Sequence, residues 1–206
     1  MIVCDRRYNS HQFWTALDTL KKRGHTFDVI STDYIIQDEI TLEASRIEQT
    51  INDIDHFDHY KYDAFMLISG NPEDTKAYWD NSIVHTYIRE ANELAKPIAA
   101  ICMSVPTIRN IAKGKRVSFF PLLRSIELLK NAGAILTTVS LSRDQNLVTA
   151  EHEIASQVWA NEFCNLLEGK PPEYNLQESG FAPKGRERKP IPAVENIRYN
   201  QRREDT

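Results

Sequence analysis

A continuous apolar run that ends at Cys102 constrains the fold of this chain more than any other segment. Residues 96–102 read Lys-Pro-Ile-Ala-Ala-Ile-Cys, and a segment with helical spacing follows them. A short apolar run bounded by proline is typical of a buried parallel strand. Pro106 fits the first turn of the helix, where a missing backbone N–H costs little. The sequence therefore predicts a strand–turn–helix unit with Cys102 at the turn.

A cysteine at such a turn has two interpretations. It faces the positive end of the helix dipole, which predicts a lowered thiol pKa and a reactive thiolate. The alternative is a small buried core residue, which is the commonest role of a single cysteine. The pattern alone leaves both open.

Strand and helix patterns alternate along most of the chain. The predicted strands are 1–5, 26–31, 62–69, 96–102, 134–139 and 146–150. The predicted helices are 11–23, 84–95, 103–112, 122–131 and 154–167. Residues 32–61 are polar and indicate a loop with a short strand or hairpin. This alternation predicts an α/β sandwich with a mostly parallel sheet, in which ligands bind beyond the carboxyl ends of the strands. Gly70 and Cys102 both follow such strand ends.

Charge and motif content exclude several classes of protein. The formal charge of −4 gives no general nucleic-acid signature. We find no run of 18 apolar residues and no glycine-rich phosphate motif, so we expect no membrane span and no cofactor. Three widely spaced cysteines, Cys4, Cys102 and Cys164, form neither a disulfide framework nor a zinc motif. Together with the lack of a secretory signal, they predict a cytoplasmic protein.

Two further segments carry clustered charges or possible metal ligands. We expect residues 1–168 to form one domain and 169–206 a proline-rich, basic extension. Residues 184–203 carry seven Lys and Arg against two Glu, which indicates a solvated tail or an arm that docks on a partner subunit. The acidic body argues against nucleic acid as the partner.

Residues 55–59 contain two His and two Asp, but they lack an evident third ligand on one face, so we predict a solvated loop and no metal.

Four fragments resemble the ThiJ/PfpI family, also called the Parkinsonism-associated deglycase superfamily, in both order and spacing. They are Tyr-Asp-Ala at 62–64 with Ser-Gly-Asn at 69–71, the run 96–102, Gly-Lys-Arg-Val at 114–117 with Asn-Ala-Gly-Ala at 131–134, and Asn-Leu-Val-Thr-Ala at 146–150. The resemblance implies a flavodoxin-like, class I glutamine-amidotransferase-like three-layer sandwich and a homodimer. Family activities include cysteine-dependent glyoxalase, deglycase, amidase and peptidase chemistry, isocyanide hydration, and chaperone or redox-sensing roles.

The resemblance also assigns roles to individual residues. It places the family's nucleophile at Cys102 and its oxyanion donors at the backbone N–H groups of Gly70 and Met103. Counting back from the glycine that closes the first helix puts the family's acid at Gln12, which donates a hydrogen bond but cannot carry a proton. A slip of one or two residues would bring His11 to the site instead, where it could act as a base. The alternative for both residues is an ordinary polar first turn of the helix.

The imidazoles that family members place beside the cysteine are absent here. Met103 stands where peptidase-like members have His, and Phe120 stands in the place of another family His. His152 or Glu151, after the strand 146–150, could compensate; the alternative is a helix N-terminus with acidic residues that suit its dipole. Asp5, Arg6 and Arg7 at the same edge would bind an anionic substrate or a neighbouring subunit.

These residues lead to one main hypothesis and two alternatives. The main hypothesis is a ThiJ/PfpI-like accessory, binding or structural protein that retains the elbow cysteine but has lost its catalytic neighbours. The first alternative is a cysteine-dependent hydrolase or glyoxalase-like enzyme acting on a small carbonyl or amide. The second is a cysteine redox sensor that oxidises to the sulfinic acid.

Overall fold

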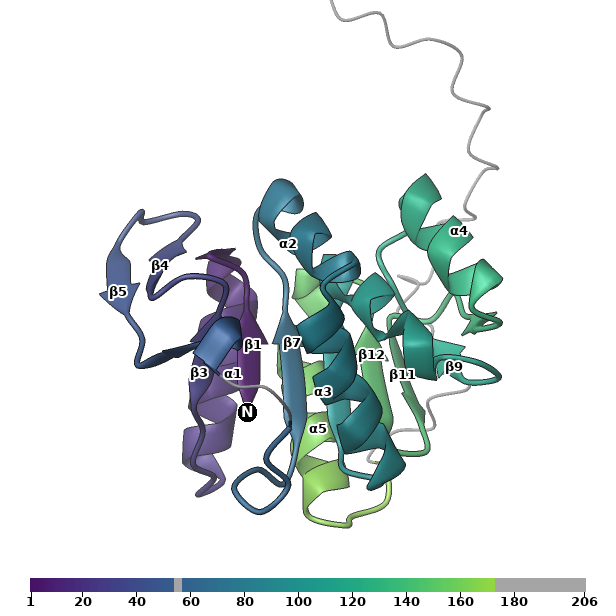
Figure 1. Ribbon diagram of the computed structural model, residues 1–206. Coiled ribbons are helices and arrows are strands. Elements are labelled where there is room, and N and C mark those ends of the chain that lie inside the picture. The colour runs from purple at the N-terminus through teal and green to yellow at the C-terminus, as the bar shows by residue number, and fades with distance from the viewer. Residues whose placement is uncertain (54–56, 173–206) are drawn as a thin grey trace, which may run out of the picture.

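A seven-stranded sheet forms the centre of the computed structural model, which describes residues 1–53 and 57–172 (Figure 1). Its strands, in spatial order, are β11 (Leu141–Asp144), β12 (Leu147–Ala150), β8 (Ile98–Ile101), β7 (Phe65–Ile68), β1 (Ile2–Cys4), β3 (Val29–Ser31) and β6 (Gln49–Thr50). The edge strand β11 runs antiparallel to β12, and the other neighbours pair in parallel. The predicted α/β sandwich with a mostly parallel sheet is confirmed.

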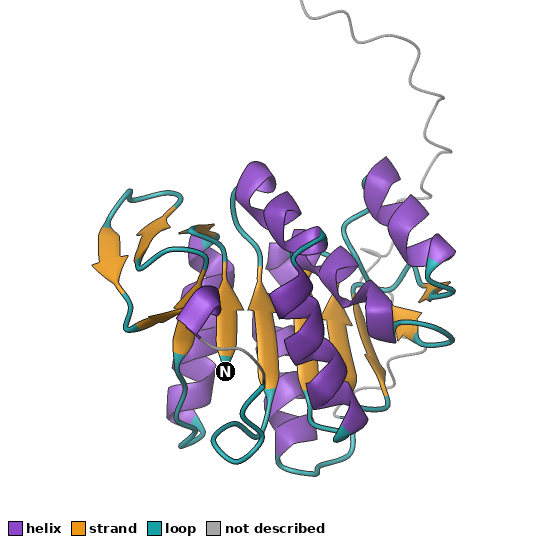
Figure 2. Ribbon diagram, in the orientation of Figure 1, coloured by secondary structure: helices purple, strands orange, loops and turns teal. Residues whose placement is uncertain are grey.

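Helices cover both faces of this sheet (Figure 2). One face carries α1 (Ser10–Lys22) and α5 (Ser156–Leu167). The other carries α2 (Pro72–Trp79), α3 (Ser82–Glu93), the 3-10 helix η2 (Cys102–Ile111) and α4 (Leu123–Asn131). Because the central strands are buried on both faces, they are apolar throughout rather than alternating. The sequences Phe-Met-Leu-Ile of β7 and Ile-Ala-Ala-Ile of β8 show this.

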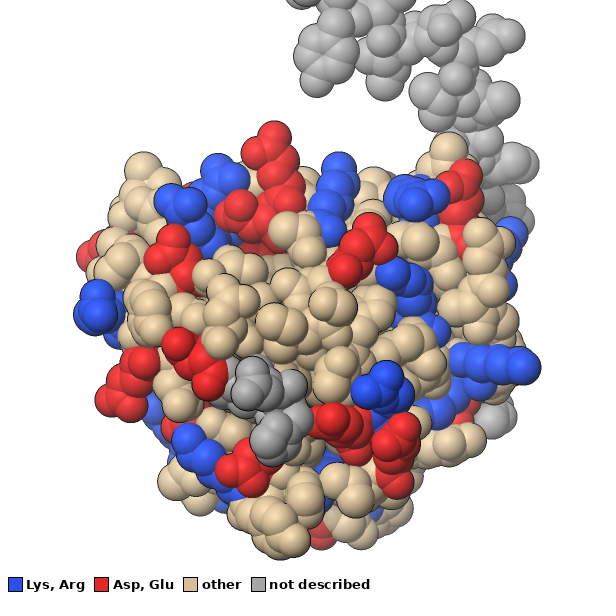
Figure 3. Space-filling model, viewed as in Figure 1, with Lys and Arg blue, Asp and Glu red and all other residues tan. Residues whose placement is uncertain are grey.

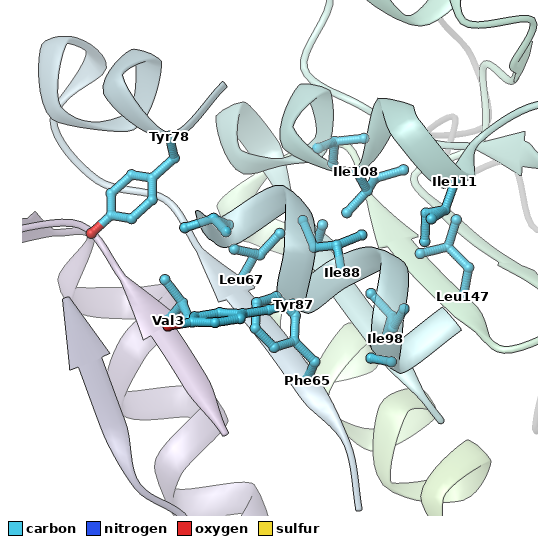
Figure 4. Close-up of a cluster of buried hydrophobic side chains, with 14 of the residues drawn as sticks. Val3, Phe65, Leu67, Tyr78, Tyr87, Ile88, Ile98, Ile108, Ile111 and Leu147 are labelled. Carbon is cyan, nitrogen blue, oxygen red and sulfur yellow. The ribbon is translucent and has the colours of Figure 1, made fainter. Parts of the chain in front are cut away.

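Alternate side chains of each strand enter different halves of the core. Val3 and Leu67 join the cluster under α3 and η2, which Figure 4 shows with Tyr87 and Ile88 packed above the sheet. Ile2 and Met66 enter the cluster under α1 and α5. Burying each large side chain of this kind stabilises the fold by about 1.5–3 kcal/mol.

The structure departs from the sequence prediction in several elements. Helix α2 and strand β11 were not predicted. The polar region holds β4 (Ile35–Asp38) and β5 (Ala44–Arg46), which form a small sheet with β2 (Arg7–Tyr8), and the short 3-10 helix η1 (Ile51–Asp53). The predicted strand 134–139 shortens to β10 (Ile135–Leu136), which pairs with β9 (Arg116–Val117) outside the main sheet.

The predicted end of the domain at residue 168 lies next to the end of α5. Arg143 holds the chain just beyond it, since its guanidinium donates to Lys170 O at 3.0 Å. Residues 173–206, most of the predicted extension, lie outside the described residues, so the docking arm stays a prediction.

The described part of the chain shows no helix long and apolar enough to cross a membrane. It also holds no group of three metal-ligating side chains, while Asp55 and His56 of the segment considered above lie outside it. Acidic and basic side chains are interspersed over the face seen in Figure 3, in keeping with the small formal charge.

Candidate functional site

Cys102 occupies a sharp turn at the carboxyl end of β8. Its backbone has a φ of +58°, a left-handed conformation that costs a non-glycine residue about 1–3 kcal/mol. Surrounding hydrogen bonds hold this turn. Ile101 N donates to Ser104 Oγ at 3.0 Å, and that hydroxyl lies 3.1 Å from Leu67 O. Trp79 Nε1 donates to Met103 O at 2.8 Å from the other side. The predicted strand–turn–helix unit is therefore present, with a 3-10 helix after the turn.

Gln12 reaches the sulfur of Cys102, as the unshifted register predicted. It is buried on the first turn of α1, whereas His11 is exposed. Gln12 Oε1 accepts from Ser69 N at 3.1 Å, and Ser69 Oγ lies 2.9 Å from the same oxygen. With its oxygen engaged in this way, the amide presents its Nε2 donor to the thiol. Gln12, Ser69 and the Met103 backbone N–H all form hydrogen bonds that favour the ionised sulfur.

Burial nevertheless raises the pKa of the Cys102 thiol, to about 11. Loss of contact with water disfavours the thiolate more than the three hydrogen bonds favour it. The charge of Glu153 adds to the increase. The lowered pKa predicted from the helix dipole is therefore wrong, because desolvation by burial is the largest cause of the shift. Cys102 is a partly exposed, neutral thiol at physiological pH, while Cys4 and Cys164 are buried.

The predicted oxyanion donor at Gly70 already has an acceptor inside the protein. Its N–H donates to Thr75 Oγ1 at 3.1 Å, and the next N–H, of Asn71, donates to Arg7 O at 2.8 Å. A side chain is not tolerated here, since a Cβ at Gly70 would lie 1.9 Å from Arg7 O. The backbone N–H of Met103, in contrast, acts on the Cys102 thiol and favours its ionised form. Of the two predicted donors, only Met103 faces Cys102 in this arrangement.

His152 has a structural position. Its Nδ1 accepts from Ile154 N at 3.4 Å and so caps the short 3-10 helix η3 (Glu153–Ala155). Its ring lies 5.7 Å from the ring of Phe120, the residue in the place of the family's second His. The alternative of a helix N-terminus therefore describes His152 better than the role of a base.

Glu153 is the carboxylate whose charge raises the pKa of the Cys102 thiol, and the sequence prediction missed it. Ala150 of β12 pairs with Ile101 of β8, so the chain after β12 emerges beside Cys102. Asn9 fixes Glu153 there: Asn9 Nδ2 donates to Glu153 Oε2 at 2.8 Å and also to Glu39 Oε1. Asn9 cannot turn its amide round, because its Oδ1 accepts from Gln12 N at 3.0 Å as the cap of α1.

A family model described as the DJ-1/PfpI family matches residues 1–166. The chain belongs to the DJ-1/PfpI family. An uncharacterised protein of Methanocaldococcus jannaschii is 26% identical over 176 residues, covering 82% of this chain and 81% of that protein.

Solved structures of the family have the same fold. A ThiJ/PfpI domain protein from Brachyspira murdochii superposes with a TM-score of 0.73 at 17% identity, covering 82% of this chain and 96% of that one. DJ-1 of Schizosaccharomyces pombe gives a TM-score of 0.69 at 15% identity, covering 84% and 92%.

The charged residues predicted to bind an anion serve the fold of this DJ-1/PfpI chain instead. Arg7 Nε donates to Asp74 Oδ2 of α2 at 2.8 Å. Asp5 is buried, and its carboxyl accepts from the hydroxyl of Thr75. Burial raises the pKa of Asp5 well above its usual range. Arg6 is exposed. Asp5 and Arg7 thus join β1 and β2 to α2 and are not arranged as an anion site.

Proposed function

We propose that this protein is a DJ-1/PfpI-family binding or accessory member whose elbow cysteine is kept as a neutral thiol. One observation carries the proposal: Gln12, buried on α1 and bonded to Ser69, stands where the family has its acid, and the groups that favour ionisation of the Cys102 thiol, namely Gln12, Ser69 and the Met103 N–H, are all neutral. None of these groups takes up a proton at neutral pH. Cysteine catalysis requires the thiolate and a group bonded to the sulfur that carries the proton. Glu153 acts on the thiol through its charge alone, without a hydrogen bond to the sulfur. Ligand binding at the strand ends requires neither the thiolate nor a group that carries the proton.

The test compares Cys102-dependent chemistry with simple binding. Wild-type protein and the Cys102→Ser variant are assayed for methylglyoxal consumption and for hydrolysis of small amides. We expect no activity that depends on Cys102. Turnover that disappears in Cys102→Ser would establish the enzyme alternative and refute the accessory role.

Oxidation by dilute peroxide, followed by intact mass, separates the redox alternative. The neutral thiol predicts no selective gain of two oxygens at Cys102, because the thiolate is the form that peroxide oxidises. Selective sulfinic acid formation at Cys102 would favour the sensor.

We further propose that the chain forms a homodimer through the surface of α1. Trp14 of α1 is 46% exposed and Ile40 is 72% exposed, and both line a hollow of about 400 Å³. Two such large apolar side chains on one face favour burial against a second copy. Light scattering is expected to give a dimer for the wild type and a monomer for Trp14→Glu. Leu123→Glu, at an apolar residue of α4 that is 74% exposed, is the control and is expected to remain dimeric.

The three free cysteines support a reducing compartment for this protein, and we propose the cytoplasm. Expression of a tagged chain followed by fractionation tests this localisation.

A further inference from the structure

Two carboxylates, Glu39 and Glu153, share the side-chain amide of Asn9, and the second of them acts on the Cys102 thiol. Glu39 follows β4 and Glu153 follows β12, and the amide of Asn9 binds both. Both are half-buried, and neither has a cationic partner among residues 1–53 and 57–172. Burial raises the pKa of Glu39, and the charge of Glu153 adds to the increase. The carboxylates of Glu39 and Glu153 are therefore held by the neutral amide of Asn9, which does not cancel their negative charge.

The negative charge of Glu153 acts on the thiol of Cys102. The register of β12 and β8 places residues 151–153 beside the turn at Cys102. The neighbouring carboxylate of Asp38 is occupied by Ser10 Oγ at 2.7 Å and by two backbone N–H groups of the following loop. Glu151 emerges at the same edge, and His152 is held as the cap of η3. Among residues 1–53 and 57–172, the charge that acts on the thiol is thus the negative charge of Glu153.

We propose that Glu153, supported by Glu39 through Asn9, is the specificity-determining residue of the Cys102 site and discriminates against anionic compounds. A negatively charged molecule that approaches the sulfur meets two fixed carboxylates, whereas a neutral or cationic molecule does not. Asn9 acts as the positioning residue, since its amide fixes the carboxylate of Glu153. The inference deepens the proposed function, because it names the charge class of compound that the same thiol admits.

Two alkylating reagents of nearly equal size test this discrimination. Iodoacetamide is neutral and iodoacetate is anionic. With either, the thiolate forms a carbon–sulfur bond, iodide leaves, and the thiol proton goes to solvent. The ratio of the two rates is independent of the thiolate fraction, because both reagents need the same ionised sulfur. The ratio therefore measures the local field rather than the thiol pKa.

We expect the wild-type protein to favour iodoacetamide by about tenfold more than a small neutral thiol does. Glu153→Gln removes the charge and keeps an oxygen that accepts from Asn9, so its ratio is expected to fall most of the way to that of the small thiol. Glu39→Gln is expected to lower the ratio by a smaller factor. Salt should reduce the wild-type ratio, because it screens charges near the surface.

Glu93→Gln is the matched control, with the same change in net charge at the end of α3. Glu93 lies close in sequence to the start of β8, at the opposite edge of the sheet from Cys102. Its ratio is expected to equal that of the wild type. Equal ratios in the wild type and Glu153→Gln, with both proteins folded by circular dichroism, would overturn the inference.

The proposed function is judged separately in the same experiment. A wild-type thiol that reacts fast with both reagents refutes the neutral thiol and leaves the charge discrimination standing. A wild-type thiol that reacts slowly with both reagents, with the same rate ratio in Glu153→Gln, supports the neutral thiol and refutes the charge discrimination.

Discussion

Cys102 should react with disulfides more slowly than an ordinary cysteine, and the structure sets the size of the effect. Its pKa is raised from 9.0 to about 11, a difference of 11 − 9 = 2 units. At neutral pH, below both values, this lowers the thiolate fraction about 100-fold. The more basic thiolate is the better nucleophile, and a Brønsted coefficient of about 0.4–0.5 restores a factor of about 8. The net expectation is a rate about tenfold below that of an exposed cysteine.

The assay follows release of thiopyridone from dithiodipyridine between neutral pH and about pH 9. Cys4 and Cys164 are buried, so Cys102 is the reacting residue in the native protein, and Cys102→Ser gives the background rate. The rate constant is expected to rise close to tenfold per pH unit without a plateau, because ionisation remains incomplete over this range. A plateau at or below neutral pH, or a rate above that of an exposed thiol, would refute the reasoning that desolvation outweighs the hydrogen bonds.

Three further predictions concern the supports of the site, each read from urea unfolding curves. Asp5→Asn is expected to raise the free energy of unfolding at neutral pH by about 1–3 kcal/mol, since the folded-state pKa of Asp5 lies above its unfolded value and wild-type stability falls as pH rises from about 4. No gain at neutral pH, or a gain that persists in acid, would contradict this. Gly70→Ala is expected to cost more than about 2 kcal/mol, because its Cβ would meet Arg7 O at 1.9 Å. Gly114→Ala, with a φ of +71° but no atom within 4 Å, should cost only about 1 kcal/mol; equal costs would show that the close contact is unimportant. Gln145→Gly is expected to stabilise by about 0.5 kcal/mol, because Gln145 has a φ of +54° in the turn between β11 and β12; a loss of stability would count against strain there.

The sequence predicted the parts of the site that depend on local pattern. The apolar run before Cys102 and the position of Pro106 defined the turn. The register of Gln12 came from the family resemblance, by counting back from the glycine that closes α1 to the position of the family's acid. These inferences needed no knowledge of distant contacts.

The sequence could not predict the parts that depend on tertiary contacts. The Gly70 N–H donates to the hydroxyl of Thr75, a contact that no local pattern reveals. Helix α2 itself begins with the capping signal Asn71, Pro72 and Glu73, which the sequence prediction missed. Glu39 lies in a polar region whose strands are short and form a separate small sheet, so its place beside Glu153 had no signal. The predicted lowering of the Cys102 pKa was wrong for the same reason, since the degree of burial is a property of the packed molecule.

The hydrogen bonds of Asn9 also bear on the order in which this protein folds. They join it to residues 30 and 144 positions further along the chain. Contacts over such long separations close late, because loop-closure entropy opposes them until the rest is in place. On the ribosome, Cys102 leaves the exit tunnel well before Glu153 does. The thiol of Cys102 is therefore exposed before Glu153 lies beside it. Reagents that the native molecule excludes can reach this thiol in the growing or refolding chain.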